Sequence, residues 1–388
     1  MSQPAPISLI PSRDDFETQL AALPESYGVY AIRSHNSLLH LSWSAQLRRR
    51  VCRLLNPRRA SGQHLAALIS HQQACIECWP CGSALEASLT IYSLAAHYHP
   101  DEYLKRLRLR FPWFVTLTRD PYPRLAVTNR PSAAPLAAVG PFSSRDAALR
   151  YEEAVLSLFQ IRRCIEPLQP APDHPGCIYG EMNLCLRPCQ LQVSAIEYAS
   201  ECARAADFLK TAPEAAVNSL SSARDRAADQ LDFEYAAQLH KQLERVRLAQ
   251  AARPEVVADL ENFNGIALTP GYRAAELQLR PMLRGCWQEP VSLEVNLEVP
   301  HAESLDTRLR HVLAPALNSS PDYSKRWEHM AIFSRWYHSS NRAGEWFPFD
   351  LRTGVPYRKI ARGLSRMARH SHPAVTSTAR AADPKSPP

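Results

Sequence analysis

A chain of 388 residues is long enough for two or three domains, each burying its own core. Its 45 basic and 38 acidic residues give a formal charge of +7. Residues 351–388 alone hold eight Lys or Arg and one Asp, so the rest of the chain is near neutral. The sequence contains neither Gly-x4-Gly-Lys-Ser/Thr nor Gly-x-Gly-x-x-Gly, which argues against an ATPase or dinucleotide-binding loop. Polyanion binding is expected at the basic end and on smaller local patches.

The chain shows no leader and no membrane span. It opens Met-Ser-Gln-Pro-Ala-Pro, without a basic and then apolar stretch, and no apolar run is long enough to cross a bilayer. We therefore expect a cytoplasmic protein whose ten cysteines are reduced, with no membrane partner. Clustered cysteines in such a protein usually bind metal.

The first elements in chain order are a short helix over 14–23 and a strand hairpin. Gly28–Arg33 and Leu38–Ser42 are the two strands, joined by a polar turn. A helix over 45–55 follows and carries a basic run that includes Arg48, Arg49 and Arg50. This region is expected to form a small α/β module.

The next cysteines, Cys75, Cys78 and Cys81, are spaced like metal ligands but have no fourth ligand nearby. On a strand, Cys75 and Cys78 would point to opposite faces, so a structural role is favoured. A helix from Ser83 follows, then strands over 110–118 and 123–128, and a helix over 144–159.

Four thiols then fall within 26 residues: Cys164, Cys177, Cys185 and Cys189. Proline and glycine fill the intervals, so the backbone must fold back on itself and the thiols can converge. Four soft thiolates suit an iron–sulfur cluster or a zinc ion, while buried apolar thiols are the plain alternative. Zinc sites usually pair their cysteines at both ends, and here only Cys185 and Cys189 form such a pair.

After this segment the sequence predicts mainly helices. One covers 194–210, and a helical hairpin over 220–248 turns near Asp232. A three-strand meander (265–269, 275–279 and 291–295) and helices over 301–316 and 322–339 follow. A last helix is predicted over 355–370 and has two distinct faces. One face carries the four arginines Arg358, Arg362, Arg366 and Arg369, and the other carries Ile360, Leu364 and Met367. Few acids are interleaved, so the guanidiniums are expected to repel one another unless a polyanion such as DNA screens them.

Together these segments resemble the UvrC family of the excinuclease ABC repair system, from about Leu23 to about Leu248. Phe159-Gln-Ile-Arg-Arg-Cys164 and Pro175-Gly-Cys177-Ile-Tyr-Gly-Glu-Met-Asn-Leu-Cys185-Leu-Arg-Pro-Cys189 are similar to the family's cluster segment. The resemblance implies a 4Fe–4S cluster on the four cysteines. Residues 227–237 resemble the UVR motif, which implies UvrB as a partner bound through Phe233 and Glu234, although His240-Lys241 replaces the usual Arg-Asp.

Gly28-Val29-Tyr30 and the helix with Arg50 resemble the GIY-YIG nuclease module at the front of UvrC, which implies Tyr30 and Arg50 as catalytic positions. The second tripeptide falls on His40-Leu41-Ser42, the lysine on Trp43, the metal-binding glutamate on Ile91 and the asparagine on Tyr103. Isoleucine offers Mg²⁺ no oxygen, and Glu86 lies roughly 140° around the helix from Ile91. We therefore expect no bound Mg²⁺ and a vestigial nuclease site.

The resulting expectation is an α+β multidomain chain. Its predicted parts are a degenerate nuclease-like domain (13–110), a strand and helix extension with the cysteine segment (111–200), a UVR-like hairpin (201–252), a C-terminal α/β domain (255–345), a basic helix (346–370) and a disordered tail (371–388). The second nuclease of UvrC and its helix-hairpin-helix module have no counterpart here.

Three functions fit. The first is a UvrC-like nucleotide excision repair protein that binds DNA, chiefly through Arg48, Arg49 and the four C-terminal arginines, without cutting it. The second is an active single-incision endonuclease that uses residues such as His40 as its base. The third is an iron–sulfur interaction protein that does not bind DNA.

Overall fold

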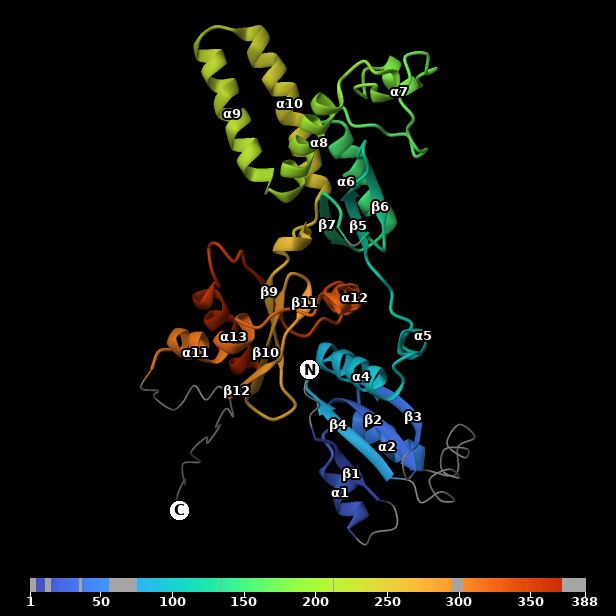
Figure 1. Cartoon of the computed structure of the whole chain (residues 1–388). Helices are drawn as coiled ribbons and strands as arrows, with labels where there is room; N and C mark the ends of the chain where they lie inside the picture. The colour runs from blue at the N-terminus through green and yellow to red at the C-terminus, as the bar shows by residue number, and fades with distance from the viewer. Residues whose placement is uncertain are drawn as a thin grey trace, which may run out of the picture.

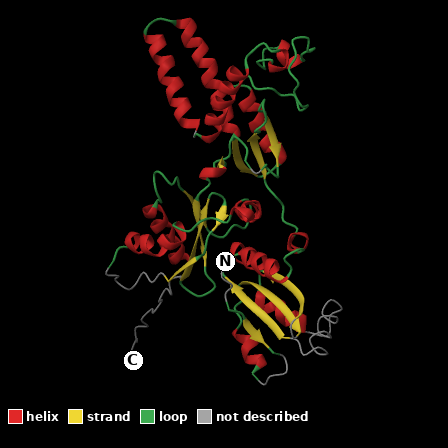
Figure 2. Cartoon of the chain, in the orientation of Figure 1, coloured by secondary structure: helices red, strands yellow, loops and turns green. Residues whose placement is uncertain are grey.

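The computed structural model describes residues 5–10, 15–34, 37–55, 75–132, 134–211, 213–294 and 303–371. Helices and sheets are mixed along the whole chain, as expected (Figures 1 and 2). Most of the predicted tail, residues 372–388, lies outside the described residues. Among the residues described, every helix is too short or too polar to span a bilayer.

The N-terminal module is a four-stranded antiparallel sheet between two helices. Its strand order is β1-β4-β2-β3, and the predicted hairpin is confirmed as β2 and β3. Helix α2 packs on one face through Leu47, Val51 and Leu54, and α4 packs on the other. The elements are β1 (Ile7–Leu9), α1 (Phe16–Ala22), β2 (Tyr27–Ser34), β3 (Ser37–Ser44), α2 (Leu47–Leu55), β4 (Cys75–Cys81), α4 (Ala84–Tyr98) and α5 (Tyr103–Leu107).

Helix α4 is apolar on two sides. Ala87, Ile91, Leu94 and Tyr98 recur at helical spacing and pack against the sheet. A second stripe, Leu85, Leu89 and Tyr92, belongs to the largest core of the molecule, which also contains Met330 and Phe333 of the C-terminal region. The helix begins cleanly because the Ser83 hydroxyl accepts a hydrogen bond from the Glu86 amide.

The middle of the chain places a small sheet, with order β6-β5-β7-β8, beside α6, α8 and a long helical hairpin (Figure 1). Strand β7 was not predicted, because Gly140-Pro141 interrupts its pattern. The elements are β5 (Trp113–Leu117), β6 (Leu125–Thr128), β7 (Ala137–Phe142), α6 (Arg145–Leu156), α7 (Ile178–Glu181), η1 (Pro188–Gln190), α8 (Ala195–Lys210), α9 (Pro213–Asp229), α10 (Phe233–Ala252), β8 (Ala258–Asp259) and η2 (Leu260–Asn262).

The C-terminal region is a five-stranded antiparallel sheet covered by helices. Strand β10 pairs with β9, β11 and β12, which confirms the predicted meander and adds β11. The elements are β9 (Gly265–Pro270), β10 (Glu276–Leu283), β11 (Cys286–Trp287), β12 (Val291–Glu294), α11 (Leu305–Leu317), η3 (Tyr323–Lys325), α12 (Arg326–Tyr337), β13 (Glu345–Pro348) and α13 (Tyr357–Ser371).

The predicted helix over 355–370 is confirmed as α13, but the wider segment assigned to it, 346–370, begins with a strand. Residues 345–348 form β13, which pairs with β9, and the helix begins at Tyr357. Trp346 and Phe347 pack into two different cores, as neighbouring strand residues do. The apolar side of α13 is confirmed, because Ile360 and Leu364 are fully buried against the sheet.

Candidate functional site

The four cysteines lie on an irregular segment beside α7 and α8. Cys177 directly precedes α7 and Cys189 lies in η1. Cys185 and Cys189 are buried, Cys164 and Cys177 are half-buried, and all four are free thiols.

The structure brings these thiols near one another. Burial raises the pKa of the Cys185 thiol to about 11, and the charges of the other three thiols raise it further. Burial likewise raises the pKa of Cys189, with smaller contributions from Cys177 and Cys164. In the absence of a cation, Cys185 and Cys189 therefore resist becoming thiolates. Among the described residues, no group of three or more His, Cys, Asp or Glu side chains is close enough together to hold a single metal ion.

Two donors already point at the sulfurs. The amide of Arg187 donates to Cys185 Sγ at 3.4 Å, and Arg162 Nη1 lies 3.6 Å from Cys164 Sγ. Hydrogen bonds of this kind stabilise negative charge on sulfur and tune iron–sulfur centres.

Arg162 is the main anchor of the segment, and the sequence analysis missed it. The side chain is 5% exposed and donates to the carbonyls of Tyr122, Cys164 and Glu166 at 2.7, 3.2 and 3.0 Å. Asp120 lies 3.7 Å from it. Its position in the stretch Phe159-Gln-Ile-Arg-Arg-Cys164 was the available signal, but nothing in the sequence distinguishes it from Arg163.

The loop is closed by backbone contacts across its length. The Ala171 amide donates to the Cys189 carbonyl at 2.9 Å, and the Leu186 amide donates to the Gln160 carbonyl at 3.1 Å. Gly176 has φ +75°, and a Cβ there would stand 2.7 Å from Gln190 Nε2. Cys177 is therefore reached through a turn that requires glycine.

In the N-terminal module the structure brings together Tyr30, His40 and Arg50. Arg50 Nε donates to Tyr30 Oη at 3.0 Å, and the rings of Tyr30 and His40 have centroids 5.7 Å apart. Tyr30 is fully buried in the core between α2 and the sheet. Burial lowers the pKa of His40, the Arg50 charge lowers it further, and Nε2 of His40 has no hydrogen-bond partner among the described residues.

The positions where the family's other catalytic residues would fall lie elsewhere. Ile91 packs against the cluster of Val29, Ala31 and Trp79, on the sheet face opposite to Tyr30. Trp43 stacks on Tyr27 with centroids 6.4 Å apart, while the Tyr103 hydroxyl lies 3.0 Å from Glu328 of α12.

Glu86 is engaged in structural contacts. Its carboxylate accepts from the Gly82 amide at 2.7 Å and from Gln278 of β10 at 3.1 Å. Burial raises its pKa. Glu86 therefore ties the N-terminal module to the C-terminal sheet.

The Cys75–Cys81 stretch is a strand, β4, as favoured from the sequence. Cys78 packs in the core with Tyr30, and Cys81 packs in the core with Val29 on the other face. Burial raises the pKa of each of these two thiols to about 12, so both remain protonated.

The helical hairpin is confirmed, with its turn over 230–232, just before the predicted Asp232-Phe233-Glu234. The Asp232 carboxylate accepts from the Tyr235 amide at 3.1 Å and so begins α10. Leu231, Phe233 and Tyr235 are 73%, 66% and 51% exposed, and Glu234 is exposed beside them. The tip therefore presents apolar side chains to solvent.

The predicted arginine faces are exposed, but two C-terminal members have acidic neighbours. Arg366 donates to Glu345 of β13 at 2.6 Å, and Arg358 lies 3.9 Å from Asp306 of α11. Few acids are interleaved on the helix itself, as predicted, but acids from other elements screen two of the four guanidiniums. On α2, Arg49 is exposed and Arg48 lies 3.8 Å from Glu25.

Comparison with known proteins gives a family match in the middle of the chain. Residues 111–208 match the family "UvrC/Cho excinuclease, middle domain". The UvrABC system protein C of Ruminiclostridium cellulolyticum is 26% identical over 269 residues, which cover 68% of this chain and 43% of the relative. That of Moorella thermoacetica is 29% identical over 268 residues, covering 67% and 42%, and that of Stenotrophomonas maltophilia is 28% identical over 237 residues, covering 61% and 38%.

The matched region thus spans about two fifths of the length of these relatives. No solved structure matches the chain.

Proposed function

We propose that this chain, whose residues 111–208 match the UvrC/Cho middle-domain family, acts in nucleotide excision repair as a DNA-binding protein that holds a 4Fe–4S cluster and does not cut DNA. The observation that carries the proposal is Ile91. It stands where the family resemblance requires a metal-binding carboxylate and is packed in an apolar cluster on the sheet face opposite to Tyr30 and Arg50.

The cluster is assigned to Cys164, Cys177, Cys185 and Cys189. Each cysteine thiolate of a four-iron cluster binds a different iron. The cysteine sulfurs around a cluster therefore lie further apart than those around one zinc ion. The four thiols affect one another's charge, as ligands of one centre would. The resemblance of the segment favours the cluster, and zinc is the alternative. When bound, the cluster would supply the positive charge that four neighbouring thiolates require.

The inactive nuclease follows from the chemistry of phosphodiester cleavage. A metal ion stabilises the leaving oxygen, and its ligands must be hard oxygens. Tyr30 is fully buried, and Arg50 holds its hydroxyl. The remaining pair therefore serves as a link between α2 and the sheet.

A second candidate function is supported by His40. Its neutral imidazole lies against Tyr30, its Nε2 is unpartnered among the described residues, and a neutral imidazole is a competent base. A single-incision endonuclease with His40 as its general base is therefore the second candidate function.

A nicking assay separates the two. Wild type, Tyr30→Phe and His40→Gln proteins are incubated with damaged supercoiled and linear duplex DNA in Mg²⁺ or Mn²⁺, with a catalytically intact UvrC as positive control. We expect no metal-stimulated nicking by any of the three. Cutting by the wild type that both substitutions abolish would replace the first proposal with the second.

DNA contact is proposed for the exposed arginines of α2 and α13. On duplex DNA, log affinity falls against log salt at roughly 0.9 per phosphate neutralised. Arg362→Ala should therefore reduce that slope by about one unit for every sequence alike. Arg366→Ala should reduce it less, because Glu345 already engages Arg366. Equal slopes for wild type and Arg362→Ala would show that α13 does not contact DNA.

For the partner, we propose UvrB, bound by the tip of the hairpin. The support is the pair of exposed residues Phe233 and Glu234, flanked by the exposed apolar side chains of Leu231 and Tyr235. Exposed apolar residues gathered at one place mark interaction surfaces.

A further inference from the structure

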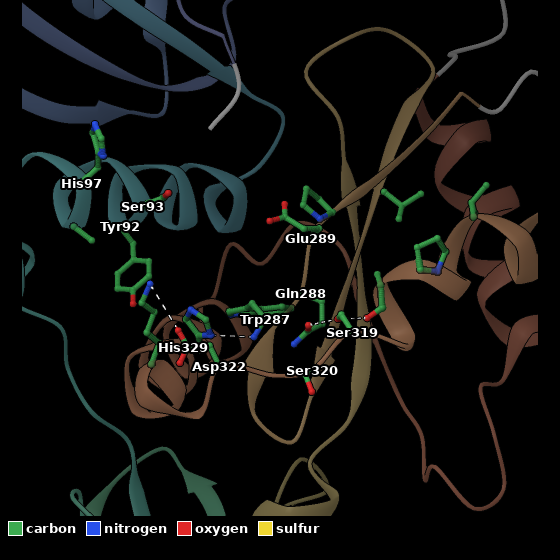
Figure 3. Close-up of a pocket in the computed structure, with 17 residues that line it drawn as sticks. Tyr92, Ser93, His97, Trp287, Gln288, Glu289, Ser319, Ser320, Asp322 and His329 are labelled. Atoms are coloured by element: carbon green, nitrogen blue, oxygen red, sulfur yellow. Dashed lines mark hydrogen bonds and ion pairs between the residues drawn. The ribbon is translucent and has the colours of Figure 1, made fainter. Parts of the chain in front are cut away.

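A cavity of about 740 Å³ lies between the N-terminal module and the C-terminal region (Figure 3). Helix α4 supplies one wall through Tyr92, Ser93 and Ala96, and the segments 287–291, 312–320 and 322–329 supply the others. Its size is that of a small-molecule site. None of its lining residues belongs to the cysteine segment or to the Tyr30–Arg50 pair.

The walls combine an apolar side with a polar side of similar extent. Pro290, Val291, Val312, Pro315 and Ala316 line it together with Trp287. Such a lining suits a ligand with a flat apolar body whose orientation is fixed by a small number of hydrogen bonds.

His329 is the buried polar group of this cavity. The residue is 4% exposed, and its Nδ1 accepts a hydrogen bond from the Trp287 amide at 3.1 Å. Burial lowers the pKa of His329 to about 4, so the ring is neutral near pH 7. A neutral ring whose Nδ1 accepts must carry its proton on Nε2. That Nε2 has no hydrogen-bond partner among the described residues.

A buried donor without an acceptor is costly, so a ligand that supplies an acceptor gains free energy there. The indole Nε1 of Trp287 is a second buried donor that lacks a partner in the described part of the chain. Both residues line the cavity. The complementary ligand therefore carries acceptors, such as ring nitrogens or carbonyl oxygens.

The charges at the cavity argue against an anion. Glu289 and Asp322 line it with one cation, Lys325, whose Nζ lies 3.9 Å from Asp322. The buried guanidinium of Arg280 also interacts with Glu289. The lining thus offers a phosphate group two carboxylates and one ammonium that Asp322 already engages, whereas a neutral heterocycle needs no cation.

We propose that this cavity binds a purine or pyrimidine base, with an acceptor atom of the base receiving the proton of His329 Nε2. The ligand is neutral and planar, and it comes either from a free nucleoside or from an unstacked base of a nucleic-acid strand. The proposal does not depend on the cluster, on nuclease activity or on duplex binding.

The test is calorimetric titration of the full chain with adenosine and with uridine. His329→Asn removes the Nε2 donor, while the Asn side-chain oxygen can still accept from the Trp287 amide. We expect affinity to fall about tenfold, the equivalent of one lost hydrogen bond. Ala96→Phe, which fills the cavity from α4, should abolish binding. The matched control is Ala199→Phe on an exposed position of α8, which should bind as the wild type does.

Adenosine 5′-monophosphate should bind more weakly than adenosine. The difference between the two affinities should become smaller in the Glu289→Gln variant. If a short single-stranded oligonucleotide competes with the nucleoside, the natural ligand is a base of a nucleic-acid strand. If it does not compete, the natural ligand is a free nucleoside. Either result supports the site. Absence of saturable binding to both nucleosides would overturn the proposal. So would wild-type affinity in both His329→Asn and Ala96→Phe, provided that their melting temperatures show folded protein.

Discussion

The cysteine segment (164–189) and the β2–β3–β4 sheet both carry residues that resemble functional positions of one family, and they differ in what holds those residues. In the cysteine segment the backbone is irregular, and the side chain that packs against the large apolar core is that of Leu186. In the sheet, apolar clusters on both faces hold the strands, and Tyr30 is one member of such a cluster.

The two regions differ in whether their fold depends on a bound group. A loop that folds back around four thiols gains its order from the bound group, because metal binding energy is folding energy. A sheet with two apolar faces folds without a metal, so its carboxylate position can become Ile91 and join the core. If the proposed assignments hold, the loop depends on its ligands for its fold, whereas the sheet folds with Ile91 in place of a ligand.

The largest contrast is expected between two buried cysteines. Cys185→Ala should remove the iron, about four atoms per chain in the wild type, and lower the free energy of unfolding by several kcal/mol. Cys78→Ala should keep all the iron and cost about 1 kcal/mol, the usual result of a small core deletion. Iron analysis, visible absorbance and thermal melts of anaerobically purified protein measure both. Stoichiometric zinc without iron in the wild type would contradict the assignment.

A smaller effect is expected when the anchor of the loop is removed. Arg162→Ala removes the buried guanidinium that donates to three carbonyls and should cost about 3 kcal/mol, with iron lost more readily to a chelator. Arg204→Ala, at an exposed arginine of α8 paired with Glu201, should stay within about 0.5 kcal/mol. Urea unfolding and chelation rates give the two readouts. Equal stabilities for the two variants would mean that Arg162 does not support the cysteine segment.

The smallest effect concerns His40 in the sheet. Its pKa is lowered on folding, so the unfolded chain takes up a proton as pH falls below about 6.5 while the folded chain resists it. The wild type should therefore lose stability from pH 7 to pH 5 more steeply than His40→Gln, by at most about 1.4 kcal/mol per pH unit. Urea midpoints at several pH values measure this. Parallel pH profiles of the two proteins would show that His40 titrates normally in the folded state.

The sequence predicted the helices and strands that have clear periodicity. The hairpin of β2 and β3, helices α6 and α8, the α9–α10 hairpin and the β9–β10–β12 meander all follow from local patterns. Strand β7 was missed because Gly140-Pro141 hides its alternation, and β13 was missed because a basic helix was expected there.

The candidate sites divide in the same way. Four cysteines in a proline-rich stretch are visible as a ligand set, because the chemistry resides in the residue type. The roles of Arg162 and His329 depend on burial and on partners distant in sequence, such as Tyr122 and the Trp287 amide. The sequence alone therefore does not distinguish them from other arginines and histidines. The Arg366–Glu345 pair was likewise hidden, because it joins a helix to a strand that had not been predicted.

Helix α4 packs into its own sheet with one stripe and into the largest core with the other. A fragment ending before residue 111 would expose the apolar side chains of Leu85, Leu89 and Tyr92 to solvent. The apolar surface against which they pack in the rest of the chain would be exposed as well. For protein production, the N-terminal module is thus a poor candidate for separate expression. The same double packing means that deletion of the module would remove a wall of the neighbouring region, whether or not the module has an activity of its own.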